Sequence, residues 1–495
     1  MKRLHSFAHV FVVALVFTGC MTRGIDIPIR MRLMAEAYLA YGKVSGVFFP
    51  SSPDAPEGMV GTVVRDLGET TAVGLAVDER GDVFVATSNR QTAGVSDNRF
   101  KPYWLLDDLA AEHVDDRRAY IEDWASRGKD PLSWYTEQSD IVLRLRDTNG
   151  DGTADEQTEF ASFNDVVTGI GASVLAHDGA LYYTNIPDVW ILRDSDDDGV
   201  VDEREQVAHG FGITTSLLGH DLHGLTWGPD GRIYFSIGDR GYNVVTSEGR
   251  HLRPPMVVSR GAVFRMQPDG SELEVFATGL RNPQDLVFDD FGNLFSGDNN
   301  GDGADQARLV HVMEGSDTGW VMPYQSMVRE DYFHGPWEAE RLWETPHPGQ
   351  PAWVHPPIGY IARGPAGAAM DPGLGGLPDQ FKGKILVSDY QYAPSRSGIR
   401  AYSVEPRGAG FTLTGTELVI GSVLPTDIAF GPDGRVYVTE FDQFQGGSKL
   451  HRFENPDHVA DPAVVALAAM LRDGFDGMSS EALAGLLGHV DRRAR

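Results

Sequence analysis

The chain repeats one short phrase, in which a glycine turn is followed by a run of β-branched and aromatic residues. Residues 227–235, Trp-Gly-Pro-Asp-Gly-Arg-Ile-Tyr-Phe, form the clearest copy. The glycines of six such turns stand at positions 81, 179, 231, 292, 383 and 434, so the gaps between them are 98, 52, 61, 91 and 51 residues. Three of these gaps suit four short strands with their loops, and the two longer gaps predict insertions. Repetition at this period indicates one strand-turn-strand unit per copy.

Each copy has the character of a β-hairpin, because glycine supplies the positive φ that a tight turn requires. Strands such as residues 233–237 are apolar at nearly every position, which indicates burial on both faces. Strands of that kind are typical of sheets that stack around an axis. The sequence therefore predicts an all-β fold, a six-bladed β-propeller. A β-sandwich of similar strands is the alternative, and the regular repeat favours the propeller.

Composition excludes several classes of function. The formal net charge is −29 with a pI near 4.8, so the chain would repel phosphate backbones and nucleic acid is not an expected partner. The only cysteine, Cys20, excludes an internal disulfide framework and a Cys-x-x-Cys-His haem attachment within this chain. With 495 residues, of which 41% are hydrophobic, the chain can bury a large core without such staples.

The N-terminal residues 1–20 have the pattern of an export signal, with Lys2 and Arg3 before an apolar run that ends in Thr-Gly-Cys. The position of Cys20 resembles a bacterial lipobox, which implies lipidation and a membrane-anchored, periplasmic protein. A cleaved secretory signal is the alternative. Both possibilities predict export.

The rest of the chain divides into three predicted parts. Residues 21–58 form a linker, 59–455 the propeller, and 456–495 a helical tail that resembles the start of a HEAT repeat. The two long gaps predict a helical insertion over residues 103–135 and a loop insertion over residues 324–357, rich in Trp, His and Pro. The second insertion is interpreted either as a wall over a site or as a packed surface loop.

Two acidic loops have the ligand spacing of calcium sites, whose hard oxygen donors select Ca²⁺ over transition metals. The first places carboxylates at loop positions 1, 3, 5, 9 and 12 and a glycine at position 6. Its predicted ligands are Asp194, Asp196, Asp198, Asp202 and Glu205. The second loop has a threonine at position 12 and is expected to bind more weakly. Its predicted ligands are Asp147, Asn149, Asp151 and Asp155. Both are interpreted as structural clips, and solvated Asp-Gly turns are the alternative.

A third acidic segment, residues 298–305, follows Arg281-Asn-Pro-Gln and a strand and precedes another strand and Gly319-Trp320. At this point the sequence resembles the soluble quinoprotein glucose/sorbosone dehydrogenases, which are six-bladed propellers that hold pyrroloquinoline quinone (PQQ). The resemblance implies that PQQ contacts Arg281 and Asn282, and that a Ca²⁺ beside it is held by the backbone carbonyls of Asn300 and Gly301. It also implies a general base at His220, five residues before Leu225, with His223 as the competing candidate.

The implied roles agree with the chemistry of the residues. A neutral imidazole can take the hydroxyl proton of an alcohol, and a guanidinium can stabilise the negative charge that develops on a quinone oxygen. The alternative for His220 is a hydrogen-bonded loop residue, and the alternative for Arg281 is a partner of a nearby aspartate.

One segment departs from the pattern of that family. Arginines that bind the carboxylates of the quinone are expected before the last blade strand, where this chain reads Leu424-Pro-Thr-Asp427. An acidic residue there could repel the cofactor. Arg363, Lys382 and Arg396 are the possible substitutes.

A broader resemblance covers nearly the whole chain, through segments such as residues 115–118, 186–188, 219–224, 335–337 and 397–400. These segments are similar to the membrane-bound, haem-binding dehydrogenases of planctomycetes and verrucomicrobia. That resemblance implies HEAT repeats and a c-type cytochrome domain beyond the propeller. This chain stops as the HEAT part begins, so a separate electron acceptor, possibly a c-type cytochrome, is expected.

The leading hypothesis is therefore an exported dehydrogenase that oxidises a sugar or polyol alcohol with PQQ and Ca²⁺. The first alternative is a non-enzymatic, calcium-stabilised propeller that binds glycans or protein partners. A propeller lactonase with a metal on the central axis is the second alternative.

Overall fold

The structure is a computed structural model that describes residues 53–91, 93–323, 336–345, 347, 349–443 and 447–495. The predictions for the export signal, for Cys20 and for most of the linker therefore lie outside the described residues. So does part of the predicted loop insertion. Within the described part of the chain, no helix combines the length and apolar character needed to cross a bilayer.

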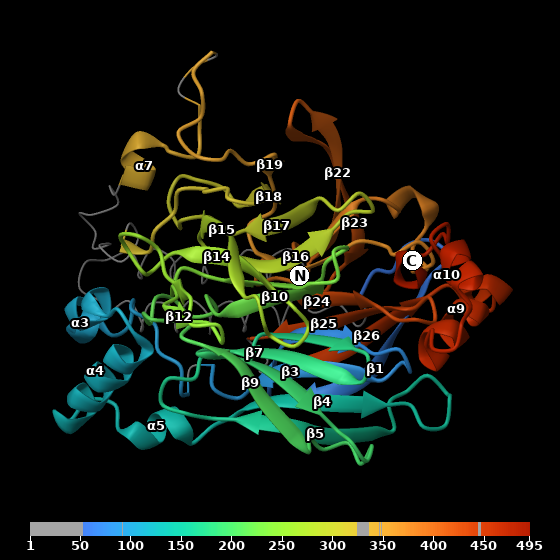
Figure 1. Ribbon diagram of the computed structural model, residues 1–495, viewed down its shortest axis with the longest axis horizontal. Helices are drawn as coiled ribbons and strands as arrows, with labels where there is room; N and C mark the ends of the chain where they lie inside the picture. The colour runs from blue at the N-terminus through green and yellow to red at the C-terminus, as the bar shows by residue number, and fades with distance from the viewer. Residues whose placement is uncertain (1–52, 92, 324–335, 346, 348, 444–446) are drawn as a thin grey trace, which may run out of the picture.

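Six antiparallel four-stranded sheets make up the molecule, which confirms the prediction of an all-β, six-bladed propeller (Figure 1). Each blade follows the chain in order, apart from the last, which takes its fourth strand from the N-terminal side. The strands of blades 1 to 3 are β2 Thr71–Val77, β3 Val83–Ser88, β4 Asp140–Arg146, β5 Glu156–Phe163; β6 Ser173–His177, β7 Ala180–Asn185, β8 Asp188–Arg193, β9 Glu203–His209; and β10 Leu222–Trp227, β11 Ile233–Ile237, β14 Gly261–Met266, β15 Glu274–Leu280. Those of blades 4 to 6 are β16 Pro283–Phe288, β17 Leu294–Asp298, β18 Arg308–Val312, β19 Gly359–Tyr360; β20 Pro365–Ala369, β21 Ile385–Asp389, β22 Gly398–Arg407, β23 Gly410–Gly421; and β24 Pro425–Phe430, β25 Val436–Asp442, β26 Gly447–Glu454, β1 Val60–Gly68.

The six repeated turns join the first and second strands of the six blades. Every one of their glycines has a positive φ, from 69° at Gly383 to 96° at Gly81. A side chain would be strained in that conformation, so the repeated glycine is what the hairpin geometry demands. Strand β11 is buried at all five positions, as its continuous apolar run predicts.

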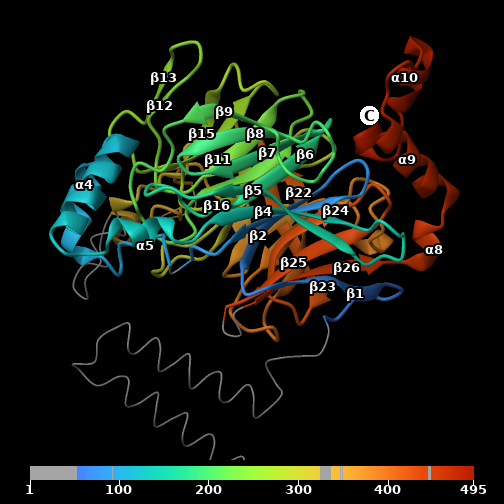
Figure 2. The same ribbon diagram turned by 90° about the horizontal axis from the view of Figure 1, so that it is seen from below.

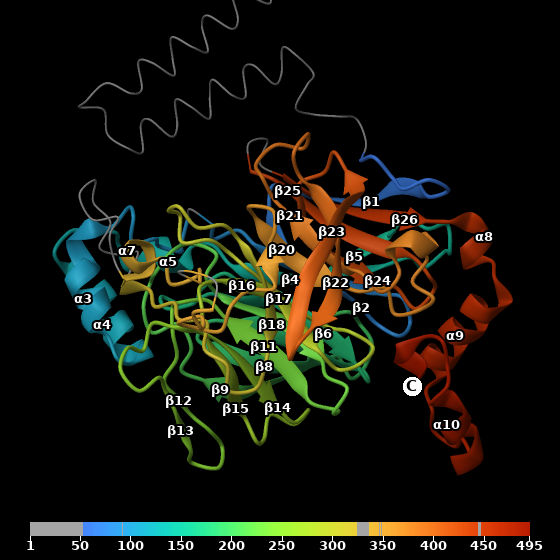
Figure 3. The same cartoon turned by 90° about the horizontal axis from the view of Figure 1, so that it is seen from above.

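Strand β1 closes the ring by pairing with β26, almost 400 residues later in the chain. Figures 2 and 3 show the two strands side by side. Gly61 lies against Phe453 so closely that a Cβ at position 61 would stand 2.8 Å from the ring. Phe453 is fully buried in the core between blades 5 and 6. The two ends of the propeller are therefore locked together by one strand and by the packing beneath it.

The inner strands of alternate blades carry a polar residue that reaches the next blade. Ser173 Oγ accepts a hydrogen bond from the backbone N–H of Leu225 at 3.0 Å. Asp285 accepts one from Ala368 at 2.6 Å, and Asp427 accepts one from Leu75 at 2.7 Å. These three hydrogen bonds connect blade 2 to blade 3, blade 4 to blade 5, and blade 6 to blade 1. This type of link therefore occurs at every second blade-to-blade interface.

Most of the described helices lie in two segments of the chain (Figure 1). The segment between β3 and β4 carries η1 Pro102–Trp104, α3 Leu105–Ala110, α4 Val114–Ser126 and α5 Leu132–Thr136. The C-terminal segment carries α8 Pro456–Val459, α9 Pro462–Asp473, α10 Ser480–Leu486 and η3 Arg492–Ala494. Its HEAT-type character stays a prediction. The remaining short elements are the hairpin β12 Val244–Val245 and β13 His251–Leu252, α7 Pro336–Glu340 and η2 Asp379–Phe381.

Candidate active site

The candidate catalytic residues stand just before two neighbouring inner strands. His220 precedes β10 and Arg281 precedes β16. Inner strands of a propeller run in the same direction, so the residues before them gather at one end of the axis. We call this end of the molecule the upper face; the turns between first and second strands lie at the opposite, lower face.

His220 is held by a carboxylate that the sequence did not single out. Its Nδ1 lies 2.7 Å from Oδ1 of Asp239, and both side chains are buried. Ser216 donates a second hydrogen bond to the same oxygen at 2.6 Å. Burial alone would raise the pKa of Asp239, but the charge and hydrogen bond of His220 and the charge of Arg281 hold it below its usual range. The imidazole is thus oriented by a carboxylate that stays ionised.

Trp320 connects this pair to Arg281. The indole Nε1 donates to Oδ2 of Asp239 at 2.7 Å, and the Arg281 guanidinium lies over the Trp320 ring, 5.6 Å from its centroid. Arg281 is 1% exposed and pairs with Asp302 at 3.1 Å. The backbone contributes as well, because the N–H of Asp239 donates to the carbonyl of Arg281 at 2.8 Å. His220 and Arg281 therefore share one connected set of side chains.

The acidic segment that begins at Asp298 wraps around the same residues. Asp298 accepts hydrogen bonds from the backbone N–H groups of Arg281 and Asn282 and forms a buried ion pair with Arg308. Gly301 lies beside Trp320, where a Cβ would stand 2.9 Å from the ring. The structure thus brings the predicted residues Asn282, Asn300 and Gly301 to the neighbourhood of Arg281.

A tryptophan of the second insertion packs against this segment. Trp337 on α7 is 1% exposed, packs edge to face on Trp320 at 5.3 Å, and donates its Nε1–H to Asp305 at 2.9 Å. The Asp305 carboxylate also accepts the backbone N–H of Gly301. The described part of the second insertion therefore supports the loop that was predicted to hold a metal.

His223, the competing base, occupies a different environment. Its Nε2 lies 2.9 Å from the carbonyl of Gly219 and 3.2 Å from the backbone N of Asp221. Burial lowers the pKa of His223 to about 4. The His223 imidazole is thus hydrogen-bonded to the backbone of its own loop and stays neutral, whereas His220 contacts the Asp239 carboxylate.

Of the three basic residues considered as partners for the carboxylates of a cofactor, two lie at the upper face and one does not. Arg363 and Arg396 are exposed in the loops before β20 and after β21, at the upper face. Lys382 lies in the lower turn of blade 5, where it pairs with Asp379, and cannot reach the site. Arg99, which the sequence did not suggest, lies on the upper rim. Its pKa is raised by Asp97 and, more weakly, by the charges of Asp302 and Tyr392, against the effect of burial.

Asp427, the acidic residue expected to repel a cofactor, lies inside the propeller and is hydrogen-bonded to its backbone. Its carboxyl accepts the backbone N–H groups of Leu75 and Ile428. Burial, and then the charge of Asp285, raise its pKa well above the usual value for an aspartate. This carboxyl therefore favours its neutral form, which removes the expected repulsion.

The first acidic loop brings three of its five predicted ligands together. Oxygens of Asp194, Asp196 and Asp202 lie within 4.8 Å of one another. Glu205 is placed on β9, where it faces Arg193 at 3.6 Å, and Asp198 accepts the backbone N–H of Val200. The sequence also gave no sign of Arg144, which donates to Asp194 at 2.9 Å and so places a positive charge beside this cluster.

The second acidic loop is closed by its own hydrogen bonds. Asp147 accepts the backbone N–H groups of Gly150 and Gly152, and Asp155 accepts the N–H and hydroxyl of Thr148. Asn149 and Asp151 accept the N–H groups two residues further on. Both loops join third to fourth strands and therefore lie at the lower face, away from His220.

A family model described as Domain of unknown function (DUF7133) matches residues 70–319, just over half of the chain. No curated protein matches.

Several solved propellers are similar at low identity. An oxidoreductase (glucose dehydrogenase) structure from Thermus thermophilus is 16% identical, with 80% of this chain and 99% of that one covered and a TM-score of 0.49. The PQQ-bound aldose sugar dehydrogenase from Streptomyces coelicolor is 16% identical over 81% and 99%, with a TM-score of 0.43. The PQQ domain of a pyranose dehydrogenase from Coprinopsis cinerea is 11% identical over 83% and 99%, with a TM-score of 0.47.

Proposed function

The chain belongs to the family described as Domain of unknown function (DUF7133), and we propose that this member is a dehydrogenase that oxidises a sugar or polyol alcohol with PQQ and Ca²⁺. The observation that carries the proposal is the connected set formed by His220, Asp239, Trp320 and Arg281. It places an oriented imidazole and a buried guanidinium at one end of the propeller axis.

His220 would take the hydroxyl proton of the substrate. Its Nδ1 is engaged by Asp239, and among the described residues nothing hydrogen-bonds to Nε2, so that nitrogen can accept a proton. The imidazolium that forms would be stabilised by the Asp239 carboxylate, whose lowered pKa keeps it ionised. Because the proton stays on His220, no other residue has to move during this step.

Arg281 would stabilise negative charge on the acceptor. A guanidinium remains protonated at any physiological pH, and burial strengthens its effect on a charge nearby. The backbone of Arg281 is fixed by Asp298, and its side chain is fixed by Asp302 and Trp320. The positive charge is therefore held in place before a substrate arrives.

One buried polar atom beside Arg281 is available to a donor group of a cofactor. Oδ1 of Asn282 is buried and has no hydrogen-bond partner among the described residues, so the amide is available to a ligand. PQQ, when bound, supplies the two-electron acceptor for the hydride of the alcohol carbon. Arg281 and Asn282 would hold it, and the carbonyls of Asn300 and Gly301 would hold its Ca²⁺. Arg99, Arg363 and Arg396 are the basic residues at the upper face that could meet its carboxylates.

Export, lipidation at Cys20 and an external electron acceptor, possibly a c-type cytochrome, belong to the same proposal. The lower-face loop around Asp194, Asp196 and Asp202 is proposed to bind Ca²⁺ as a structural clip, and the loop around Asp147 to bind it more weakly.

The test is reconstitution of the purified protein with PQQ and CaCl₂, followed by dye reduction with a panel of sugars and polyols. His220→Gln should lower turnover by about 10²–10⁴-fold, which is the usual contribution of a general base. His209→Gln, an exposed histidine on β9, is the control and should leave turnover unchanged. PQQ-dependent turnover that survives in His220→Gln, or that never occurs in the native chain, would contradict the proposal.

A glycan-binding propeller without catalysis is the second candidate, favoured by aromatic residues on the upper rim. Tyr392 is 56% exposed and stacks edge to face on Tyr390 at 5.3 Å, and it lies close enough to Arg99 to contribute to the raised pKa of that guanidinium. Exposed aromatic rings and cations of this kind suit sugar recognition. Binding of a sugar panel by calorimetry, with no turnover on any member, would favour this candidate.

A further inference from the structure

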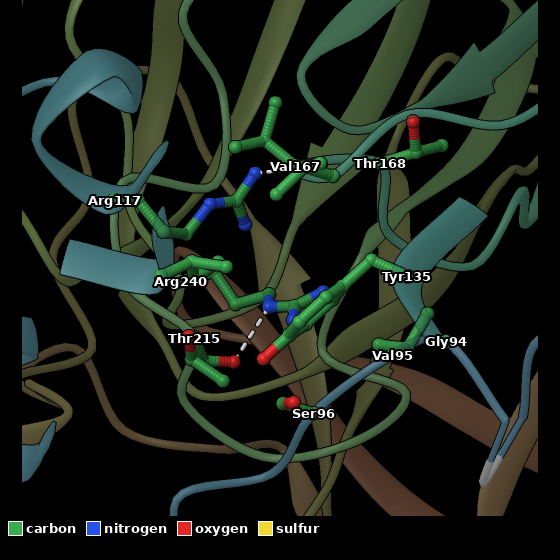
Figure 4. A pocket seen from close by; sticks show the side chains of 11 residues that line it. Gly94, Val95, Ser96, Arg117, Tyr135, Val167, Thr168, Thr215 and Arg240 are labelled. Carbon is green, nitrogen blue, oxygen red and sulfur yellow. Dashed lines mark hydrogen bonds between the residues drawn. The ribbon is translucent and has the colours of Figure 1, made fainter. Parts of the chain in front are cut away.

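A small pocket lies beneath the helical insertion, beside the candidate active site. Helix α4, the loop after β3 and the loops before β6 and β10 form its walls (Figure 4). It is lined by Gly94, Val95, Ser96, Arg117, Ile121, Tyr135, Val166, Val167, Thr168, Thr215 and Arg240. Two of these residues are arginines, and both are almost completely buried.

Arg117, from α4, is 3% exposed and has no carboxylate of its own. Its Nη2 donates to the carbonyl of Val167, and its Nε is buried without an acceptor. Among the described residues it forms no ion pair. A buried guanidinium without a counter-charge is strongly unfavourable, so an unpaired arginine in a pocket requires an explanation.

Arg240 adds a second positive charge to the same pocket. It is 2% exposed, donates its Nε–H to the carbonyl of Thr215 at 2.7 Å, and forms an ion pair with Asp221. Burial, and then the charge of Arg240, lower the pKa of Arg117 to about 10. The two guanidiniums are therefore close enough to repel each other, and Figure 4 shows both beside Thr215 and Tyr135.

Two carboxylates lie near the pair, and neither is hydrogen-bonded to Arg117. Asp221 accepts Arg240 and the backbone N–H of Ile170 through Oδ1, and its Oδ2 is buried without a partner among the described residues. Asp108 accepts the hydroxyl of Tyr120 at 2.7 Å, the amide of Asn98 and the backbone N–H of Thr215. Neither forms an ion pair with Arg117, although the charges of both act on it.

We propose that the Arg117–Arg240 pocket binds one small anion, no larger than a halide, carboxylate or phosphate group. The anion would accept from the unpaired Nε–H of Arg117 and balance the two guanidiniums. The cavity volume is about 20 Å³, little more than one water molecule needs, whereas pockets for larger ligands occupy roughly 300–1,000 Å³. A sugar or PQQ does not fit these limits.

The pocket shares its walls with the segments that orient His220. Thr215 precedes Ser216, which bonds Asp239, and Arg240 follows Asp239 directly. Asp221, the partner of Arg240, follows His220. The bound anion would therefore brace the backbone on both sides of the His220–Asp239 pair. Anion binding itself does not depend on the proposed dehydrogenase function.

The first experiment locates the anion directly. Crystals of the native chain are soaked in sodium bromide, and the anomalous signal of bromine is mapped. We expect a bromide within hydrogen-bond distance of Arg117 Nε. Bromide found only elsewhere on the molecule would overturn the proposal.

The second experiment measures stabilisation in solution. Thermal unfolding is followed while sodium bromide, formate or phosphate replaces the sodium salt of a bulky sulfonate at constant ionic strength, and the anion that raises Tm at the lowest concentration identifies the preferred chemistry. Arg117→Met should weaken the apparent affinity by about tenfold or more, the effect of losing a charge-assisted hydrogen bond.

Arg127→Met is the matched control for that variant. Arg127 lies on the same stretch of chain, is exposed, and pairs with Asp123, so the substitution removes the same charge outside the pocket. Equal anion dependence in the native chain, Arg117→Met and Arg127→Met would overturn the proposal. If Arg117→Met does not fold, the bromide position in native crystals decides.

Discussion

The carboxylate of Asp239 lies 2.7 Å from the imidazole of His220, and this contact distinguishes blade 3 from blades 4 and 5. In blades 4 and 5 the aspartate at the end of the second strand pairs with an arginine of the third strand, as in Asp298 with Arg308 and Asp389 with Arg400. In blade 3 the corresponding carboxylate instead engages a histidine of the upper loop. The aspartate at the end of the second strand thus orients an imidazole in blade 3, whereas it forms an ion pair with an arginine in blades 4 and 5.

Asp239→Asn should therefore reduce activity more than it reduces folding. The amide can keep one acceptor oxygen but cannot stabilise an imidazolium, so kcat/KM for sugar oxidation should fall by about 10²-fold or more. The measurement is dye reduction by the PQQ-reconstituted protein, together with Tm for the same samples.

The native chain should also lose stability as pH falls below the ordinary aspartate value of about 3.9, because the lowered pKa of Asp239 stabilises the fold only above it.

The surface offers a matched control for that variant. Asp188 contacts Nδ1 of His209 at the same 2.7 Å, but the His209 side chain is 53% exposed. Asp188→Asn removes an aspartate-histidine pair of equal length that is not part of the connected set around Arg281, and it should leave kcat/KM unchanged. Equal losses in both variants would show that the His220–Asp239 contact has only a structural role.

Calcium should stabilise the protein through the first lower-face loop. Asp196→Asn removes one of three clustered carboxylates, so it should weaken Ca²⁺ binding and reduce the rise in Tm that CaCl₂ gives over EDTA. Glu205→Gln should change neither quantity, since Glu205 faces Arg193 on β9. A Glu205→Gln effect as large as that of Asp196→Asn would show that the loop closes around the ion by bringing Glu205 inward.

The repeated turn made the fold predictable from the sequence, whereas the contacts within the candidate site could not be predicted. Glycines with positive φ, such as Gly231, mark a backbone requirement that a sequence displays directly. The link from His220 to Asp239 depends on how the end of β11 meets the loop before β10, and Trp320 joins them from 81 residues beyond Asp239. Such contacts follow from blade stacking and leave no local pattern. The end of each second strand is where an acidic residue could have been sought.

The closing strand shows the same limit. Residues 60–68 were assigned to the propeller, but their pairing with β26 could not be read from the sequence, because the partner lies at the other end of the chain. The hydrogen bonds of a sheet edge are identical for every possible partner strand. The pairing of β1 with β26 is determined by closure of the six-bladed propeller.

Phe453→Ala should destabilise this closure strongly. The ring is fully buried and packs where β1 meets β26, so truncation leaves a cavity that β1 cannot fill. The expected loss is about 3–5 kcal/mol in the free energy of unfolding, measured by urea denaturation. Val60→Ala on the exposed end of β1 is the control and should change stability by about 0.5 kcal/mol or less. A small effect of Phe453→Ala would mean that the ring does not depend on this packing.

Asp285 should make the propeller less stable as pH rises. Burial raises the pKa of Asp285, and the pKa of Asp427 is raised by burial and by the charge of Asp285. A folded-state pKa above the unfolded value of about 3.9 means that the folded state holds the extra proton. The contribution of these two carboxyls to stability is therefore full below the unfolded value and is lost as pH rises through their raised pKa. Asp285→Asn, which imitates the protonated carboxyl, should flatten the dependence of Tm on pH between about pH 5 and pH 8. Asp178→Asn, in the exposed turn of blade 2, should keep the native slope. A native Tm that rises over this range, or a slope unchanged by Asp285→Asn, would show that the carboxyl between blades 4 and 5 is ionised when folded.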